Sequence, residues 1–250
     1  MATSTVYLDD RGTVRKSVSG QASYEVARSA ARGSNTTTGT STGASNIQSV
    51  AYGVDIANER GVTKGASFYR AYYSFDIGAI IGEDTISALV LNVFGTSNSG
   101  GDSRVVKANS NASFGTIATS DYPNVFNSTT SMTAYSSAIA AWSTSTLNPN
   151  SITLNSTAVD NMNSQTGGSQ YLTIGLINNE HDYANVTATT TFSKFNGVRY
   201  DTTGVYRAYV TVTHESAGFG KDVNSVTAAN IVQINGIATA NITKLNGISA

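Results

Sequence analysis

The chain of 250 residues has no cysteine, and it has only two prolines and one tryptophan. The lack of cysteine excludes a disulfide framework and a zinc site built on thiolates. Charged residues are also scarce, at 12% of the chain, which is about half the share of a typical globular domain. The net charge of −1 provides no overall attraction to nucleic acid or to an anionic membrane surface. We therefore expect neither as a partner.

Long hydrophobic runs are missing as well. No stretch approaches the roughly 18 to 20 apolar residues that a membrane-spanning helix requires. The opening sequence, MATSTVYLDDRG, lacks the basic segment and the apolar core of a secretory signal. These features predict a soluble protein that is made in the cytosol, or a form that has been processed.

The polar positions are filled by threonine, serine, asparagine and glycine rather than by charged residues. Tyrosine, with 13 copies, outnumbers phenylalanine, with 8. Tyrosine and threonine favour the pleated, half-buried surfaces of β-sheets. This composition predicts an all-β protein from a large assembly, in which neighbouring chains cover much of the surface. An ordinary secreted β-domain is an equal alternative on composition alone.

The densest apolar block covers residues 68–95 and predicts two strands around a short loop. The first strand has the period-two alternation that is typical of a half-buried strand. Its apolar face consists of Tyr69, Ala71, Tyr73, Phe75 and Ile77, opposite Arg70, Ser74 and Asp76. The second strand has two apolar faces, which consist of Leu89, Leu91 and Val93 and of Ile86, Ala88, Val90 and Phe94. Such a strand is expected at the centre of a two-layered fold or under another subunit.

Shorter patterns on either side predict further strands and two helices. Strands are expected at 3–8, 47–56 with an interruption at Gly53, 104–108, 171–177, 187–195 and 206–213. One helix is expected over 23–32 with Ser23 as its N-cap, although part of it also fits a strand. A second helix is expected over 131–142, ending at Trp142, which should pack in the core. Together these elements predict a jelly-roll β-sandwich with one or two short helices.

The segment 33–46, GSNTTTGTSTGASN, contains one alanine and no larger apolar residue, so it cannot bury a core of its own. It is the strongest candidate for a domain boundary. We therefore expect three parts: an N-terminal arm with this linker at 1–46, a jelly-roll sandwich at 47–216, and a C-terminal segment at 217–250.

The C-terminal segment contains an internal repeat with a period of eleven residues, ANIVQINGIAT at 229–239 and ANITKLNGISA at 240–250. Each copy combines apolar residues with an Asn-Gly pair, which is typical of tight hairpin turns. Two copies are too short to form an independent core, and they are too apolar for a solvated end. We predict that the tail docks onto another surface through Ile231, Ile234, Asn235, Gly236, Ile237, Ile242, Leu245, Asn246, Gly247 and Ile248.

Residues with catalytic or metal-binding chemistry are sparse. His181 lies between Glu180 and Asp182, but neighbours on a strand point to opposite faces, so an exposed loop is expected here rather than a metal site. Ser103 follows Gly101-Asp102, superficially similar to the serine block of certain esterases, yet no histidine-containing block accompanies it. We therefore expect no enzyme activity, no metal and no cofactor.

Glycan binding is an alternative role, and it would need aromatic residues exposed on one face. Tyr122, Tyr183 and Tyr200 lie in loop-like stretches and are the candidates. Contacts between subunits would use the same type of residue, so these tyrosines do not decide between the two roles.

The apolar block resembles jelly-roll modules of the disaggregatase-related and carbohydrate-binding type, over about residues 48–215. The matching positions are Arg70, Tyr73, Phe75, Asp76, Ile80, Ile86, Ala88, Leu89, Leu91 and the stretch 207–212. The tail is similar to the Ile-Asn-Gly-rich C-termini of tailed-phage structural proteins. These resemblances imply a virion protein assembled in the host cytoplasm, a capsid decoration or fibre component that forms homo-oligomers and contacts other virion proteins. They also imply glycan binding as the alternative.

Overall fold

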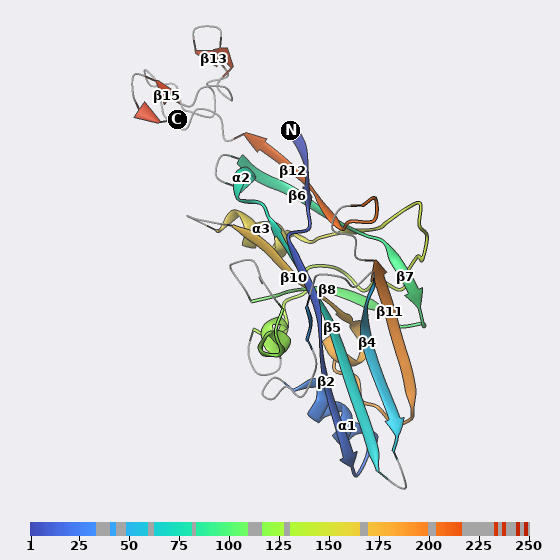
Figure 1. Ribbon diagram of the computed structural model, residues 1–250. Helices are drawn as coiled ribbons and strands as arrows, with labels where there is room; N and C mark the ends of the chain where they lie inside the picture. The colour runs from blue at the N-terminus through green and yellow to red at the C-terminus, as the bar shows by residue number, and fades with distance from the viewer. Residues whose placement is uncertain are drawn as a thin grey trace.

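The computed structural model describes residues 1–33, 41–43, 49–59, 63–81, 84–109, 117–127, 131–165, 170–199, 204–216 and short strand pairs between 233 and 249. Two β-sheets and a few short helices make up its body, so the prediction of an all-β sandwich is confirmed. In Figure 1, β12 and β6 of the small sheet lie at the top, and the long strands β2, β5, β4 and β11 of the large sheet continue below them.

The small sheet has four antiparallel strands in the order β1-β12-β6-β9. They are β1 (Ala2–Tyr7), β12 (Tyr209–Ser216), β6 (Asp84–Val93) and β9 (Asn150–Thr153). The large sheet has eight strands in the order β3-β2-β5-β4-β11-β7, with β10 paired to β5 and β8 paired to β10. They are β3 (Ser41–Gly43), β2 (Asp10–Gln21), β5 (Lys64–Asp76), β4 (Ser49–Asn58), β11 (Phe192–Arg199), β7 (Gly95–Asn98), β10 (Tyr171–Asn178) and β8 (Ser103–Lys107).

Short helical elements connect and cover the sheets. They are α1 (Tyr24–Arg32), α2 (Gly78–Ile81), the 3₁₀ helix η1 (Thr119–Val125), α3 (Ser156–Asn163) and the π-helical turn η2 (Asn179–Tyr183). The predicted first helix and its cap are confirmed in α1, because the backbone N–H of Val26 donates to Ser23 Oγ at 3.2 Å. Asn155 caps α3 in the same way, accepting from the N–H of Ala158 at 3.1 Å.

Strand β5 separates two hydrophobic cores. Ala71, Tyr73 and Phe75 belong to the core between the sheets, whereas Phe68 and Tyr72 belong to a second core on the opposite face of the large sheet. This second face is covered by α1 and η1, which contribute Ala27, Ala31, Tyr122 and Val125. Because of this cover, the prediction of a half-buried strand is wrong. Arg70 and Ser74, which were expected on a solvated face, are fully buried.

Strand β6 lies at the centre of the small sheet, between β12 and β9. Leu89, Leu91 and Val93 face the core, as predicted. Ile86 joins them instead of facing the other way, because the register with β12 shifts by one residue next to it. Val90 lies on the outer face of the sheet and is half-buried.

The predicted helix over 131–142 does not form. The segment runs instead as an irregular chain along β8, where Ile139 forms a β-bridge with Ser103. The N–H of Ile139 donates to the carbonyl of Ser103 at 2.8 Å, and the N–H of Tyr135 donates to that of Val105 at 2.9 Å. Hydrogen bonding to a neighbouring strand therefore outweighs a local pattern that fits a helix.

Trp142, at the end of this segment, packs in the core between the sheets, as predicted. Its ring meets that of Tyr52 edge-on, with the centroids 5.7 Å apart. Its indole N–H donates to the carbonyl of Gly197 at 3.2 Å, so the one polar atom of the side chain is satisfied.

The N-terminal segment, which was predicted as an arm, contributes one strand to each sheet. β1 pairs with β12 from Ala2↔His214 to Tyr7↔Tyr209, and β2 pairs with β5. Of the predicted linker, residues 34–40 and 44–46 lie outside the described part of the chain, and the backbone of β3 between them pairs with β2. Residues 2–21 therefore belong to the sheets of the sandwich.

The tail contains two short antiparallel strand pairs, one in each copy of the repeat. β13 (Gln233–Ile234) pairs with β14 (Ile237–Ala238), and β15 (Lys244–Leu245) pairs with β16 (Ile248–Ser249). Four predicted docking residues lie in these strands, namely Ile234, Ile237, Leu245 and Ile248. The others lie outside the described residues, namely Ile231, Asn235, Gly236, Ile242, Asn246 and Gly247.

Candidate functional site

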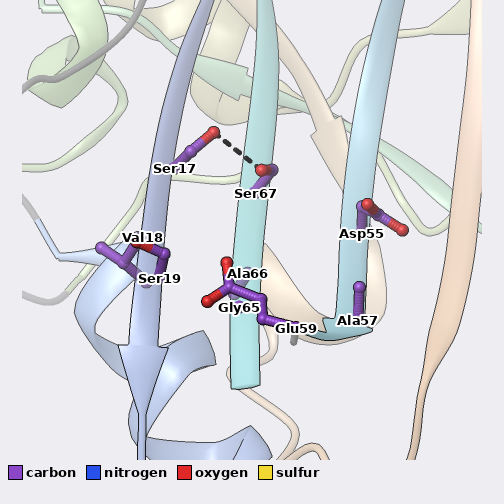
Figure 2. A pocket seen from close by; sticks show the side chains of 9 residues that line it. All are labelled: Ser17, Val18, Ser19, Asp55, Ala57, Glu59, Gly65, Ala66 and Ser67. Atoms are coloured by element: carbon purple, nitrogen blue, oxygen red, sulfur yellow. Dashed lines mark hydrogen bonds between the residues drawn. The ribbon is translucent and has the colours of Figure 1, made fainter. Parts of the chain in front are cut away.

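A hollow of about 190 Å³ lies on the large sheet, where β2, β5 and β4 continue beyond the small sheet (Figures 1 and 2). We call it the polar hollow, because its lining is mostly small or polar: Ser17, Val18, Ser19, Asp55, Ala57, Glu59, Gly65, Ala66 and Ser67. Figure 2 shows Ser17 and Ser67 pointing toward each other from neighbouring strands, and their hydroxyl oxygens are 2.7 Å apart.

Strand pairing places one polar row across the hollow. Ser17 pairs with Ser67, Ser67 with Asp55, and Asp55 with Ser193 of β11. Residues in register share a face of the sheet, so these short side chains lie side by side. The serine hydroxyls both donate and accept hydrogen bonds, whereas an ionised carboxylate only accepts them.

A second row, two residues along each strand, is aromatic. It consists of Arg15, Tyr69, Gly53 and Phe195 in register. Gly53 leaves space in which the rings of Tyr69 and Phe195 meet edge-on, with the centroids 5.1 Å apart. A Cβ on Gly53 would lie 2.6 Å from Phe195 Cδ1 and 2.2 Å from the carbonyl oxygen of Lys194, and its φ of +153° is rare for other residues. β4 continues through Gly53 without the predicted interruption, and the missing side chain at this position is what allows the aromatic pair to meet.

Charged groups border both rows, and two of them have unused hydrogen-bonding capacity. Arg15 donates through Nη1 to the Tyr69 hydroxyl at 3.0 Å, but its buried Nε has no partner among the described residues. Asp55 is half-buried, and within the described ranges it makes no hydrogen bond or ion pair. Glu59 closes one end of the hollow and accepts from the backbone N–H of Gly20 at 2.7 Å. A polyhydroxylated ligand would satisfy such groups while an apolar face packs on the rings.

The opposite face of the large sheet carries a buried charge network that ties α1 and η2 to β5. Arg70 and Asp182 form a bidentate ion pair, with Nε–Oδ2 at 2.8 Å and Nη2–Oδ1 at 2.7 Å, and neither side chain is more than 1% exposed. Arg70 also donates to the backbone oxygens of Tyr122 and Arg32 at 2.9 and 3.1 Å. Burial by itself lowers the pKa of Arg70, but the charge and hydrogen bonds of Asp182, together with the neighbouring Tyr122 and Tyr72, outweigh burial and raise this pKa. This network is structural, because protein atoms already occupy its hydrogen-bonding groups.

Glu180, His181 and Asp182 form part of η2 rather than the exposed loop that was predicted. His181 and Asp182 are buried, and the His181 ring stacks on Phe192 with the centroids 4.2 Å apart. Asp182 enters the buried ion pair, whereas Glu180 pairs with Lys194. Within the described residues, no cluster of three His, Asp or Glu side chains could hold a metal ion.

Ser103, the serine considered for nucleophilic catalysis, is buried in β8. Its Oγ lies 2.6 Å from the Tyr52 hydroxyl, and Asn196 Nδ2 donates to it at 2.7 Å. Ser103 therefore links β8 to β4 and β11 inside the core, and it is not a surface nucleophile.

Two of the three tyrosines considered for glycan binding can be placed. Tyr122 is fully buried, and its hydroxyl donates to the carbonyl of Ala31 at 2.8 Å, so it is a core residue. Tyr183 is half-buried, with the Arg104 guanidinium 4.2 Å from the centre of its ring. Tyr200 lies outside the described residues.

Sequence reasoning missed the aromatic surface that the structure does form. Tyr69 and Phe195 come from strands 126 residues apart in the chain, and only the pairing of both with β4 brings them together. Gly53 was the available signal, because a glycine inside a strand often marks a place where neighbouring groups approach closely.

A second, more open hollow of about 420 Å³ lies between β9 and residues 136–141. Its lining has no charged residue: Ser136, Ser137, Ala138, Ile139, Ala140, Ala141, Ser151, Ile152 and Thr153.

Among the described residues, no helix has the length and apolar character needed to cross a membrane. No protein-family model matches the chain, and no curated protein matches it in sequence.

Proposed function

We propose that this protein is a structural component of a tailed-phage virion, exposed on the particle as a capsid decoration protein or a fibre component. The observation that carries the proposal is the tail, where both copies of the repeat form the same antiparallel pairing, Ile234↔Ile237 and Leu245↔Ile248. Isolated two-stranded hairpins are marginally stable at best in water. The repeats gain stability by packing on a neighbouring chain or by adding strands to its sheet edge.

The outer face of the small sheet supports a role in contacts between chains. Strand pairing puts short, uncharged side chains on this face: Thr3, Thr5, Ala88, Val90, Thr153, Thr211 and Thr213. All of them are exposed or half-buried. The edges of this sheet are β1 and β9 among the described strands. A face with little charge between two strand edges suits packing against other copies or other virion proteins.

Burial of the apolar tail residues provides enough free energy for docking. At ~25 cal/mol per Å², burying ~300 Å² of apolar tail surface provides a gross driving force of ~7.5 kcal/mol. Ordering the segment and restricting the two partners reduce this value. Many tails on one particle act together, so a modest affinity for each chain is enough for stable attachment.

The test is the incorporation of tail variants into particles in the phage host. Deletion of 229–250 should abolish incorporation, measured as the protein's abundance in purified particles by mass spectrometry. A matched variant keeps the length and the Asn-Gly pairs but replaces Ile234, Ile237, Leu245 and Ile248 with serine, and it should fail in the same way. Circular dichroism and light scattering on the purified chains check that the sandwich is folded. Normal occupancy of either variant would contradict the docking role.

The polar hollow favours a second function, the binding of host or surface glycans. The carboxylate of Asp55, the serine hydroxyls and the Arg15 guanidinium lie beside the Tyr69–Phe195 pair, so polar and aromatic groups together match the polar and apolar faces of sugar rings. A glycan array followed by calorimetry on the intact chain tests this function. Asp55→Asn and Phe195→Ala should each weaken binding at least about tenfold, since each loses a contact worth ~1.4 kcal/mol or more. Ser151→Ala, on the outer face of the small sheet, is the control and should bind normally.

The two functions give different outcomes. Stable oligomers that bind no glycan would support only the structural role. Glycan binding that Asp55→Asn does not weaken would mean that the glycan site lies outside the polar hollow. Particle incorporation of Asp55→Asn should be normal in either case, because the tail carries the docking.

A further inference from the structure

A hydrogen-bonded serine, histidine and aspartate lie together in the small sheet, away from the polar hollow. Ser4 of β1, His214 of β12 and Asp84 of β6 come from three neighbouring strands. Ser4 Oγ lies 2.9 Å from His214 Nε2, and Asp84 Oδ2 is hydrogen-bonded to His214 Nδ1. A hydroxyl on one ring nitrogen and a carboxylate on the other is the arrangement of Ser-His-Asp hydrolases, which is recognised by geometry on unrelated folds.

A bulge in β6 produces this arrangement. Thr213 pairs with Ala88, but His214 pairs with Ile86, so Ser87 is an extra residue on β6. The shift brings Asp84 one residue closer to His214 than regular pairing would. Bulges re-aim side chains in this way and are frequent beside active sites.

Hydrogen bonds orient the three side chains, and all three are partly exposed. The His214 and Asp84 side chains are 10% and 19% exposed, and Ser4 is half-buried, so the hydroxyl is both held and reachable. An ionised Asp84 only accepts hydrogen bonds, so it keeps the proton of neutral His214 on Nδ1. His214 Nε2 is then free to accept the hydroxyl proton of Ser4, which is the role of a general base.

We propose that Ser4 is an activated nucleophile that accepts acyl groups from carboxylic esters. Ser4 Oγ forms a bond to the ester carbonyl carbon while its proton passes to His214 Nε2. The bond from that carbon to the alcohol oxygen breaks, and the alcohol leaves with the proton from His214. Water then attacks the acyl carbon and gives one proton to His214 Nε2, and the acyl group leaves as the carboxylic acid. That proton returns to Ser4 Oγ as the acyl–serine bond breaks.

This inference goes beyond the structural role, and it departs from the sequence-based expectation that the protein has no enzyme activity. The Ser4–His214–Asp84 arrangement could not be predicted from the sequence, because Ser4 and His214 are 210 positions apart. It also stands independently of the tail, since all three residues belong to the sandwich.

The test treats the purified full chain with a fluorophosphonate probe, which reacts with activated serines, and with p-nitrophenyl acetate. We expect one label per chain, located on Ser4 by peptide mass spectrometry, and release of p-nitrophenol. Ser4→Ala should abolish both signals, and Asp84→Asn should lower the labelling rate at least about tenfold through the loss of general-base function. Thr3→Ala, an exposed neighbour on the same strand, should label at the wild-type rate.

Three results would overturn the proposal: no labelling of the wild-type chain, a label on another residue, or labelling that survives Ser4→Ala. In each case the hydrogen bonds between the three residues would only stabilise the contact between β1, β12 and β6. Thermal unfolding of every variant shows whether it is folded. If Asp84→Asn does not fold, the peptide map of the wild-type chain and the labelling of Ser4→Ala still decide the question.

Discussion

The two faces of the large sheet use charged residues in opposite ways. On the face covered by α1 and η1, Arg70 is enclosed and bonded to Asp182 and to two backbone oxygens. On the other face, at the polar hollow, Arg15 keeps a nitrogen without a partner, and Asp55 keeps a free carboxylate within the described residues. A charge removed from water is tolerated only when it is paired, so the covered face has a complete network. The carboxylate of Asp55, by contrast, is only half-buried, so solvent can stabilise its charge.

The largest effect is expected from breaking the pair on the covered face. Asp182→Asn leaves the buried charge of Arg70 uncompensated and should lower the free energy of unfolding by about 3–5 kcal/mol. Denaturant unfolding of the purified chain measures this. The double variant Arg70→Met with Asp182→Leu removes both charges and should lose clearly less. A loss below about 1 kcal/mol for Asp182→Asn would show that the network does not anchor α1 and η2.

Gly53 lies where β4 approaches β11 too closely for a side chain, and its substitution should have the next largest effect. Gly53→Ala forces a Cβ against the carbonyl of Lys194 in a strained conformation, so we expect a loss of about 1–3 kcal/mol. Gly20→Ala is the matched control, because Gly20 also has a positive φ, +70°, but open space around its Cβ. It should cost ~1 kcal/mol. Equal losses in the two variants would mean that the close approach at Gly53 is unimportant.

Acid should weaken the covered face through two partly exposed carboxylates. The bond from Arg28 lowers the pKa of Glu25, and the bond from Lys194 lowers the pKa of Glu180, both from an ordinary value of 4.5. A lowered pKa stabilises the fold above pH 4.5, and this contribution is lost as the pH falls through the folded-state values. Each contribution should be below ~1 kcal/mol because of solvent screening.

Unfolding measured between pH 7 and pH 3 tests this dependence. Glu25→Gln and Lys194→Met should each make stability less dependent on pH below 4.5. A pH profile identical to that of the wild-type chain in both variants would contradict the assignment.

The smallest effect on stability is expected on the open face. Asp55→Asn should change the free energy of unfolding by no more than about 0.5 kcal/mol, because this carboxylate holds no other described residue in place. Thermal and denaturant unfolding measure the difference. A loss comparable to that of Asp182→Asn would show that the two faces do not differ in the way proposed.

Local pattern was sufficient where an element depends on its own residues. The Ser23 cap and the following helix were predicted because an N-cap hydroxyl satisfies a backbone N–H a few positions away. The core-facing positions Leu89, Leu91 and Val93 were predicted because side chains alternate along a strand. These features need no knowledge of distant partners.

Predictions from the local sequence pattern were wrong where a distant element changed the secondary structure or the burial of a segment. The segment 131–142 fits a helix, but β8 supplies hydrogen bonds that favour an extended chain. Ile86 faces the core because a bulge reverses the alternation, and Arg70 is buried because α1 and η1 cover its face. The polar hollow and the Ser4–His214–Asp84 set were invisible for the same reason, since each joins residues from several strands.

The sequence by itself determined that this is an all-β protein without disulfides, with a capped first helix and a repeated tail that carries Asn-Gly turn signals. Composition, alternation and capping are properties of neighbouring residues, so they can be read along the chain. Only the tertiary structure decided which charges are buried and paired, which remain free, and which serine meets a histidine. Those outcomes depend on strand order and register, which are set by long-range pairing and by the packing of helices on a sheet.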